Sequence, residues 1–157
     1  FVTMALVGGP PPSQAGELWG TASLTARHAE DMVQRHGEVV RLNEDNRGAG
    51  LELRAGRWAA LAGSYTDSFG SSEKYGILAY RAIEVGGAIR VGMDIAAGGI
   101  THTVAKEVTG GPVIPAILPV GYVGVGNVEV RAMYVPAVTD GAVAFAFFQA
   151  SIKMGEW

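Results

Sequence analysis

Short stretches in which apolar and polar side chains alternate every second residue, separated by glycines, make up most of this chain. The 157 residues include 23 glycines, about twice the usual share of roughly 7%. Glycine favours turns, bulges and close sheet packing over long helices, and alternation with a period of two indicates β-strands. We expect about eight to ten short strands, which is typical of a sandwich, jelly roll or barrel.

The clearest predicted element is a β-hairpin that turns at Gly86-Gly87. Glycine reaches the positive φ that two-residue hairpin turns require. Centring the register on this turn places Tyr80 opposite Met93 and makes one face largely apolar. On the other face, Arg81 lies diagonal to Asp94, within reach for a charge pair. A slip of one residue would destroy both features, so the pattern supports this register.

A second hairpin is predicted to turn at Asp140-Gly141. Its incoming strand alternates regularly over residues 127–134. Its outgoing strand, residues 142–154, is apolar on both faces near the turn, unlike a strand that is wet on one side. We therefore expect this strand to be central in a sandwich or pressed against a neighbouring subunit.

Two segments interrupt the alternation. Residues 28–36 are predicted to form a short helix that ends at Gly37, a residue suited to a left-handed helix stop. Residues 110–121 are apolar but contain three prolines, which exclude a helix. We interpret them as an extended crossover that lies on the core or in an interface.

Residues 1–16 are predicted to form an extended arm ahead of a single domain, residues 17–157. Three consecutive prolines at 10–12 favour an extended polyproline conformation. The alternative is an edge strand packed on its own domain. The predicted fold is thus all-β, an antiparallel β-sandwich or jelly-roll-like domain with an extended N-terminal arm and at most one short helix.

The composition restricts the partners of this domain. Charged residues are 17% of the chain, below the usual ~25%, so much of the surface must be apolar, small or hydroxylated. This composition is typical of a domain that other copies partly cover. The net charge of −3 and the lack of a basic cluster argue against nucleic-acid binding. No apolar run approaches the ~20 residues of a helical membrane span, so a soluble protein is predicted, compatible with a virion or the extracellular space.

No motif in the chain carries a recognisable chemistry. The chain has no cysteine, and His28 and His36 are eight residues apart, whereas a zinc-binding helix places two histidines four apart. The carboxylates Glu52, Asp94 and Glu129 alternate with apolar residues and are expected to be solvated charges on outer strand faces. We predict no catalytic residue, no cofactor and no metal site.

These observations lead to three hypotheses about function. The first is a non-enzymatic structural protein that forms a homo-oligomer, trimer or larger, such as a virion decoration, tail or capsid-associated subunit. Its interface would comprise Phe1, Val2, Met4, Leu6, Val7, Val143, Phe145 and Phe147. The alternative is a ligand- or carbohydrate-binding module that uses Trp19, Trp58 and Tyr65. An enzyme whose site forms only in three dimensions is the second alternative.

Overall fold

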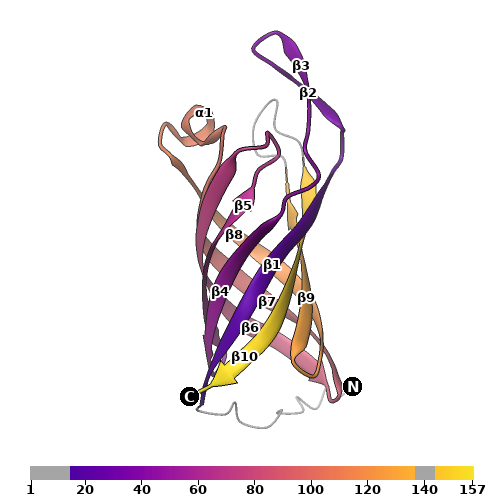
Figure 1. Cartoon of the computed structure of the whole chain (residues 1–157), viewed down its shortest axis with the longest axis vertical. Helices are drawn as coiled ribbons and strands as arrows, with labels where there is room; N and C mark the ends of the chain where they lie inside the picture. Colours follow the sequence, from indigo (N-terminus) through magenta and orange to yellow (C-terminus); the bar gives the residue numbers. More distant parts are fainter. Residues whose placement is uncertain (1–14, 137–143) are drawn as a thin grey trace, which may run out of the picture.

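A computed structural model describes residues 15–136 and 144–157 and shows a closed antiparallel β-barrel (Figure 1). Eight strands form the barrel in the order β1-β10-β9-β8-β7-β6-β5-β4, and β1 pairs with both β10 and β4 to close it. The strands are β1 (Gly16–His28), β4 (Gly48–Ala55), β5 (Trp58–Thr66), β6 (Ser72–Gly86), β7 (Ile89–Thr101), β8 (Val113–Val125), β9 (Val128–Val135) and β10 (Phe145–Glu156).

The two ends of the barrel differ in their connections (Figure 1). At one end, short turns join β4 to β5, β6 to β7 and β8 to β9, and Gly56 and Gly126 adopt positive φ values of 58° and 55° there. The described termini meet at this end, because the backbones of Gly16 and Trp157 exchange two hydrogen bonds of 3.0 Å. We call it the short-turn end.

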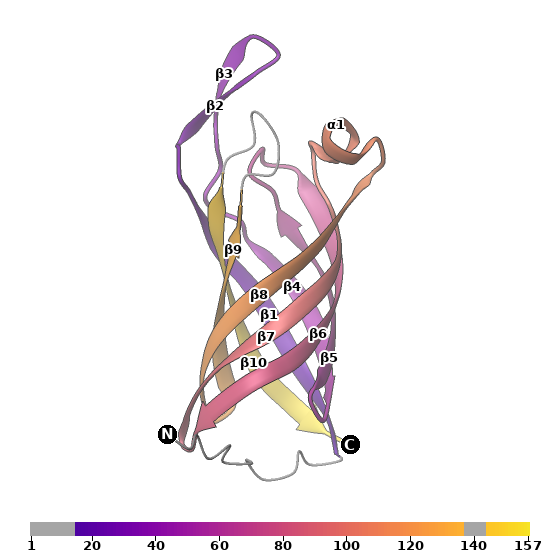
Figure 2. The same ribbon diagram turned by 180° about the vertical axis from the view of Figure 1, so that it is seen from behind.

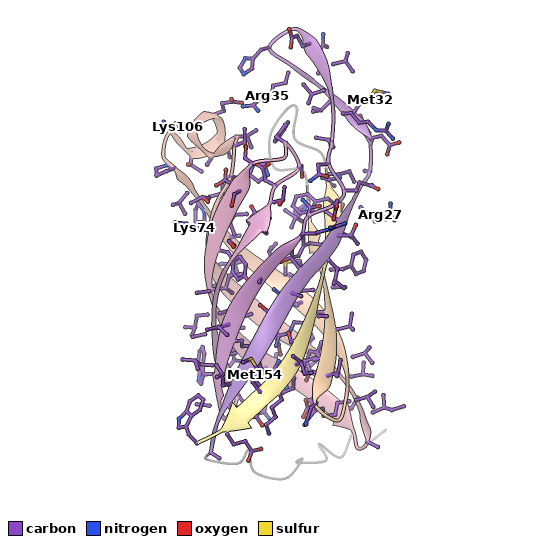
Figure 3. The ribbon with its side chains drawn as sticks, viewed as in Figure 1. Arg27, Met32, Arg35, Lys74, Lys106 and Met154 are labelled. Atoms are coloured by element: carbon purple, nitrogen blue, oxygen red, sulfur yellow. The ribbon has the colours of Figure 1, made fainter. Side chains whose placement is uncertain are left out.

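The opposite end, which we call the long-loop end, carries the larger connections. They include a separate hairpin of β2 (Met32–Arg35) and β3 (Glu38–Arg41) and a short helix α1 (Ala105–Thr109). Figure 3 shows Arg35 and Lys106 both at this end, with Met154 on the barrel wall toward the short-turn end. An ion pair between Arg35 and Glu107 joins the extra hairpin to α1.

Side chains alternate between the inside and the outside of the barrel along every strand, as the pleat requires. In β4, Leu51 and Leu53 are exposed on the outside, whereas Glu52 and Arg54 are buried inside. In β9, the outward Val128 and Val130 likewise flank the buried Glu129. The apolar face is therefore the outer one on these strands.

Glycine makes room for two aromatic rings. A Cβ atom at Gly63 would lie 2.5 Å from the hydroxyl oxygen of Tyr75, and a Cβ atom at Gly92 would lie 2.5 Å from the ring of Tyr122. Any larger residue at these two positions would displace a ring. Part of the high glycine content thus reflects packing between neighbouring strands and rings rather than turns alone.

The prediction of an antiparallel all-β fold is confirmed, and the sheet closes on itself as a barrel instead of forming the two packed layers of a sandwich. The chain has one short helix within the described ranges, but it is α1. The prediction of a helix at residues 28–36 is wrong, because β2 and β3 form a hairpin there. Its turn contains His36 and Gly37, with φ values of 51° and 85°. The predicted arm falls almost entirely on residues 1–14, outside the described residues.

The first predicted hairpin exists as β6 and β7, but its register differs from the predicted one. Tyr80 pairs with Ile95 instead of Met93, because the turn is centred on Ala88, where Gly86 pairs with Arg90, and a bulge between Arg81 and Ile83 then changes the register by one residue. Near the turn the register differs by three residues, and beyond the bulge it differs by two, which leaves the faces unchanged. Arg81 consequently stands opposite Asp94, with Nε 3.2 Å from Oδ1.

The second predicted hairpin pairs β9 with β10, while its predicted turn at Asp140-Gly141 lies outside the described residues. The prediction of a crossover at residues 110–121 is wrong for most of its length. Residues from Val113 onward belong to β8, which pairs with β7 along all 13 of its residues.

Candidate functional site: an apolar wall around a charged interior

The outer wall of the barrel is apolar on every strand. Large apolar side chains that face outward and are exposed come from all eight barrel strands. They are Leu24, Leu51, Leu53, Trp58, Leu78, Tyr80, Ile83, Val85, Ile89, Val91, Ile95, Val113, Ile117, Val123, Val125, Val128, Val130, Tyr134, Ile152 and Met154. Exposed apolar patches larger than a few hundred Å² are rare on monomers in water and mark surfaces that contact something else.

Aromatic side chains lie toward both ends of this wall. Trp58, which is 53% exposed, packs against Tyr80 with ring centroids 4.9 Å apart, and Trp157 is exposed at the short-turn end. Tyr134, 60% exposed, stands near the other end of β9. Amphipathic rings suit a boundary where one side is apolar and the other wet.

The interior of the barrel near the short-turn end holds a network of charges. Arg54 donates two hydrogen bonds to the carboxylate of Glu129, of 2.9 and 3.1 Å, and a third of 2.6 Å to Glu52. Arg131 donates to the same two carboxylates at 2.8 and 2.7 Å. The two glutamates have no exposed surface. Two Glu-x-Arg pairs, one on β4 and one on β9, thus interlock across the lumen.

A third arginine extends the network to two further strands. Arg81 on β6 donates to Glu129 at 3.2 Å and to Asp94 on β7 at 3.2 Å. It also donates to Glu84 at 3.0 Å, and the Tyr122 hydroxyl donates to the same Glu84 oxygen at 2.8 Å. The charges of the network are thus paired within the barrel. Such pairing is needed to offset the free energy that it costs to remove ions from water.

Aromatic rings cover the faces of two of these arginines. The guanidinium of Arg54 stacks 3.7 Å from the ring centre of Trp19, and that of Arg81 lies 4.1 Å from the ring centre of Tyr122. Trp19 is only 1% exposed, and its Nε1 donates to Glu17 at 2.9 Å. A cation over an aromatic face gains about 0.5–2 kcal/mol, more when water is excluded, so the rings add to the stability of the network.

Between the network and the long-loop end, the interior of the barrel changes from charged to apolar. A cavity of about 100 Å³ lies there, and Asp94 and Arg131 contribute to its lining from the network. A second cavity, of about 160 Å³, lies toward the long-loop end. Both are lined by Ile100, Ala116, Leu118, Val135 and Phe145. The interior therefore has a charged part near the short-turn end and a hollow, largely apolar part toward the long-loop end.

A buried carboxylate fastens the loops at the long-loop end. Asp67 accepts hydrogen bonds from the backbone N–H groups of Phe69 and Ser71 at 2.9 and 2.8 Å. It also accepts from the N–H and hydroxyl of Thr103 at 3.1 and 2.5 Å. Burial by itself raises the pKa of Asp67, but these donors outweigh it and hold the pKa below the ordinary 3.8. Asp67 thus ties the connection after β5 to the connection after β7.

A serine and a histidine also meet at this end. The Nε2 of His28 lies 2.8 Å from the hydroxyl of Ser68, and both residues line the second cavity. A hydrolytic triad also needs a group that orients the histidine through its other nitrogen. Within residues 15–136 and 144–157, Nδ1 of His28 is buried and has no hydrogen-bond partner. The pair alone does not define a catalytic site.

The structure describes two residues of the predicted assembly interface and all three of the predicted ligand site. Of the predicted assembly interface, Phe145 and Phe147 line the interior cavity instead of the outer surface, and the remaining six residues lie outside the described residues. Of the predicted ligand site, Trp19 is inside near the short-turn end, Trp58 is outside, and Tyr65 lines the first cavity, next to the charge network. These three aromatic residues do not converge on one site.

Sequence reasoning missed the charge network, because it assigned Glu52, Asp94 and Glu129 to solvated outer faces. That prediction is wrong, since all three are buried inside the barrel. The signal was present as two Glu-x-Arg pairs, Glu52 with Arg54 and Glu129 with Arg131. Opposite charges two residues apart share one face of a strand, and two such faces can pair with each other.

Comparison with known proteins gives no assignment for this chain. No protein-family model matches it, and no curated protein matches it. In the part of the chain that the structure describes, no helix is long and apolar enough to cross a membrane. The same residues contain no group of three or more histidine and acidic side chains that could hold a metal ion.

Proposed function

We propose that this chain is a membrane-spanning β-barrel whose outer wall contacts the hydrocarbon of a lipid bilayer. The observation that carries this proposal is the inverted barrel wall, with large apolar side chains outside and paired charges inside. A protein surrounded by water gains free energy by the opposite arrangement, at roughly 25 cal/mol per Å² of apolar surface buried. In lipid, an apolar exterior needs no cover, and a closed barrel leaves few backbone groups unpaired.

The dimensions and the two ends of the barrel support the proposal. A strand crosses a bilayer with about 9–11 residues when it is tilted, and the barrel strands here have 8 to 15 residues. Membrane barrels of the bacterial outer-membrane type have an even number of antiparallel strands, short turns at one end and longer loops at the other. They also carry aromatic residues at both membrane boundaries. Each of these features has a counterpart in this chain.

Two native tryptophans provide the test, because they lie on opposite sides of the wall. One variant retains only Trp58 (W19F, W157F), and its matched control retains only Trp19 (W58F, W157F). After reconstitution into vesicles that contain phospholipid brominated on its acyl chains, we expect quenching of the outward Trp58 and little quenching of the inward Trp19. Equal fluorescence of the Trp58 variant with and without bromine would contradict contact with lipid.

An assembly subunit is the second candidate, because copies of this chain could also cover an exposed apolar wall. It retains the hypothesis of a homo-oligomer, trimer or larger, in a virion or similar structure. A contact between subunits covers a sector of a surface, whereas this wall extends over all eight strands. Light scattering without detergent separates the two candidates. A stable closed oligomer in water would support the assembly, and a requirement for detergent would support the membrane barrel.

A further inference from the structure

The barrel wall has a seam between β8 and β9. Their ladder runs from the turn up to the pair Val120 and Met133 and ends there, although β8 extends to Val113 and β9 to Val135. Figure 2 shows the ribbons of β8 and β9 diverging toward the long-loop end. We define the seam by residues 117–119 of β8 and residues 134 and 135 of β9.

Pro119 lies in the β8 edge of this seam, and Pro115 lies two residues beyond it. Pro115 and Pro119 have no N–H group, so neither can donate a ladder hydrogen bond. Proline within a sheet is confined to edges or bulges, and β8 keeps its pairing with β7 across both positions. The interrupted pairing is therefore on the β9 side, where the sequence itself lacks the donors that would extend the ladder.

The first cavity, of about 100 Å³, lies on the interior side of the seam. Leu118 from β8 and Val135 from β9 both line it, and Phe147 from β10 lines it as well. On the outer side, the seam is flanked by Ile117 and Tyr134, which are 75% and 60% exposed and belong to the apolar wall. Apolar side chains thus continue from the outer wall, past both edges of the seam, to the interior of the barrel.

We propose that the cavity binds the acyl chain of a membrane lipid, which enters through the seam from the bilayer. The inference rests on the proposed membrane function, because only lipid around the wall would supply an acyl chain at the position of the seam. A hydrocarbon chain needs no hydrogen-bond partner, and it would fill space that otherwise leaves the apolar lining without contacts. An acyl chain that entered from the long-loop end would instead pass the polar side chains of His28, Ser68 and His102, which line the second cavity.

Photochemical labelling in vesicles tests the proposal. The probe is phosphatidylcholine with a diazirine at the end of one acyl chain, and mass spectrometry locates its adducts. We expect adducts on the interior residues Leu118 and Phe147 in addition to the outward residues Ile117 and Tyr134. The variant Ala116→Trp, which fills the cavity from β8, should lose the interior adducts. The matched variant Val123→Trp, whose side chain faces outward on β8 outside the seam, should keep them.

Each other outcome counts against a specific claim. Adducts confined to outward residues of the unmodified chain would overturn the acyl-chain site but leave the membrane barrel intact. Interior labelling by a water-soluble, short-chain diazirine carboxylic acid, with none from the lipid probe, would also overturn the proposal, because the ligand would then enter from the long-loop end. Absence of all lipid adducts would contradict the proposed function itself.

Discussion

The inner and outer faces of the same strands differ in what they require from their surroundings. Inside, each buried charge of the network has partners at fixed distances, so its stability depends on individual contacts. Outside, the apolar side chains have few partners within the chain, and their stability depends on the medium. The comparison shows that the alternation of a strand specifies two faces, while the solvent determines which face turns inward.

The largest expected effect comes from breaking the inner network. Glu129→Gln removes the charge that Arg54, Arg81 and Arg131 share, which leaves guanidiniums buried without compensation. Loss of one partner of a buried ion pair costs about 3–5 kcal/mol. Urea unfolding in vesicles, followed by tryptophan fluorescence, measures this loss. Glu38→Gln on the exposed hairpin strand β3 is the control and should leave the midpoint unchanged.

The next largest effect comes from placing a charge on the outer face. Ile95→Arg puts a guanidinium midway along β7, between Tyr80 and Pro119. An arginine near the middle of a bilayer costs a membrane barrel about 2–4 kcal/mol, and the same urea assay in vesicles would measure it. If the wall faced water instead, the substitution would be almost neutral, so an unchanged unfolding midpoint contradicts the proposed function.

Acid should weaken the long-loop end before it affects the apolar wall. Because the folded state holds the pKa of Asp67 below 3.8, the unfolded chain binds the proton more readily. The stabilising contribution of Asp67 is therefore present above pH 3.8 and is lost as the pH falls below it. Asp67→Asn should cost about 1–3 kcal/mol at neutral pH, because an amide cannot accept all four hydrogen bonds. Proton exchange of the backbone N–H groups of Phe69 and Ser71, measured by NMR, checks both expectations.

The smallest effect comes from the edge of the outer wall. Ile89 begins β7 beside the short turn and is exposed. Arginine at a membrane boundary costs only about 0–1 kcal/mol, so Ile89→Arg should hardly move the urea midpoint in vesicles. Similar losses of stability for Ile89→Arg and Ile95→Arg would show that the cost of an arginine does not depend on its position along the wall. That result would contradict a bilayer environment.

The sequence predicts the strands well, since alternation is a local property. It does not predict the position of the turn, where Gly86 pairs with Arg90, or the bulge between Arg81 and Ile83, and these two features set the register of an otherwise recognisable hairpin. The helix predicted at residues 28–36 fails for a related reason, because the left-handed conformations of His36 and Gly37 can end a helix or form the turn of a hairpin.

The candidate site is harder to predict, because its parts are far apart in the chain. Arg54 and Glu129 are 75 residues apart and meet only after the barrel closes. The expectation of charges on solvated outer faces assumes that an apolar face is always the buried one. A search for apolar runs of about 20 residues detects helical spans and is insensitive to strands, which cross a bilayer with about half that length. The expectation of a soluble protein rests on that search, and the proposed function departs from it.

The pairing of charges inside the barrel has an electrical consequence. Three arginines, at positions 54, 81 and 131, face three buried carboxylates, at positions 52, 94 and 129. They extend across the lumen from β4, β6, β7 and β9. An ion that moved along the barrel axis would have to separate these pairs and shed its own water, because each charged group of the network, including Glu84, already has a partner of opposite charge. The barrel should accordingly act as an insulator rather than a conductor, and a bilayer that contains it should carry no steady current through it.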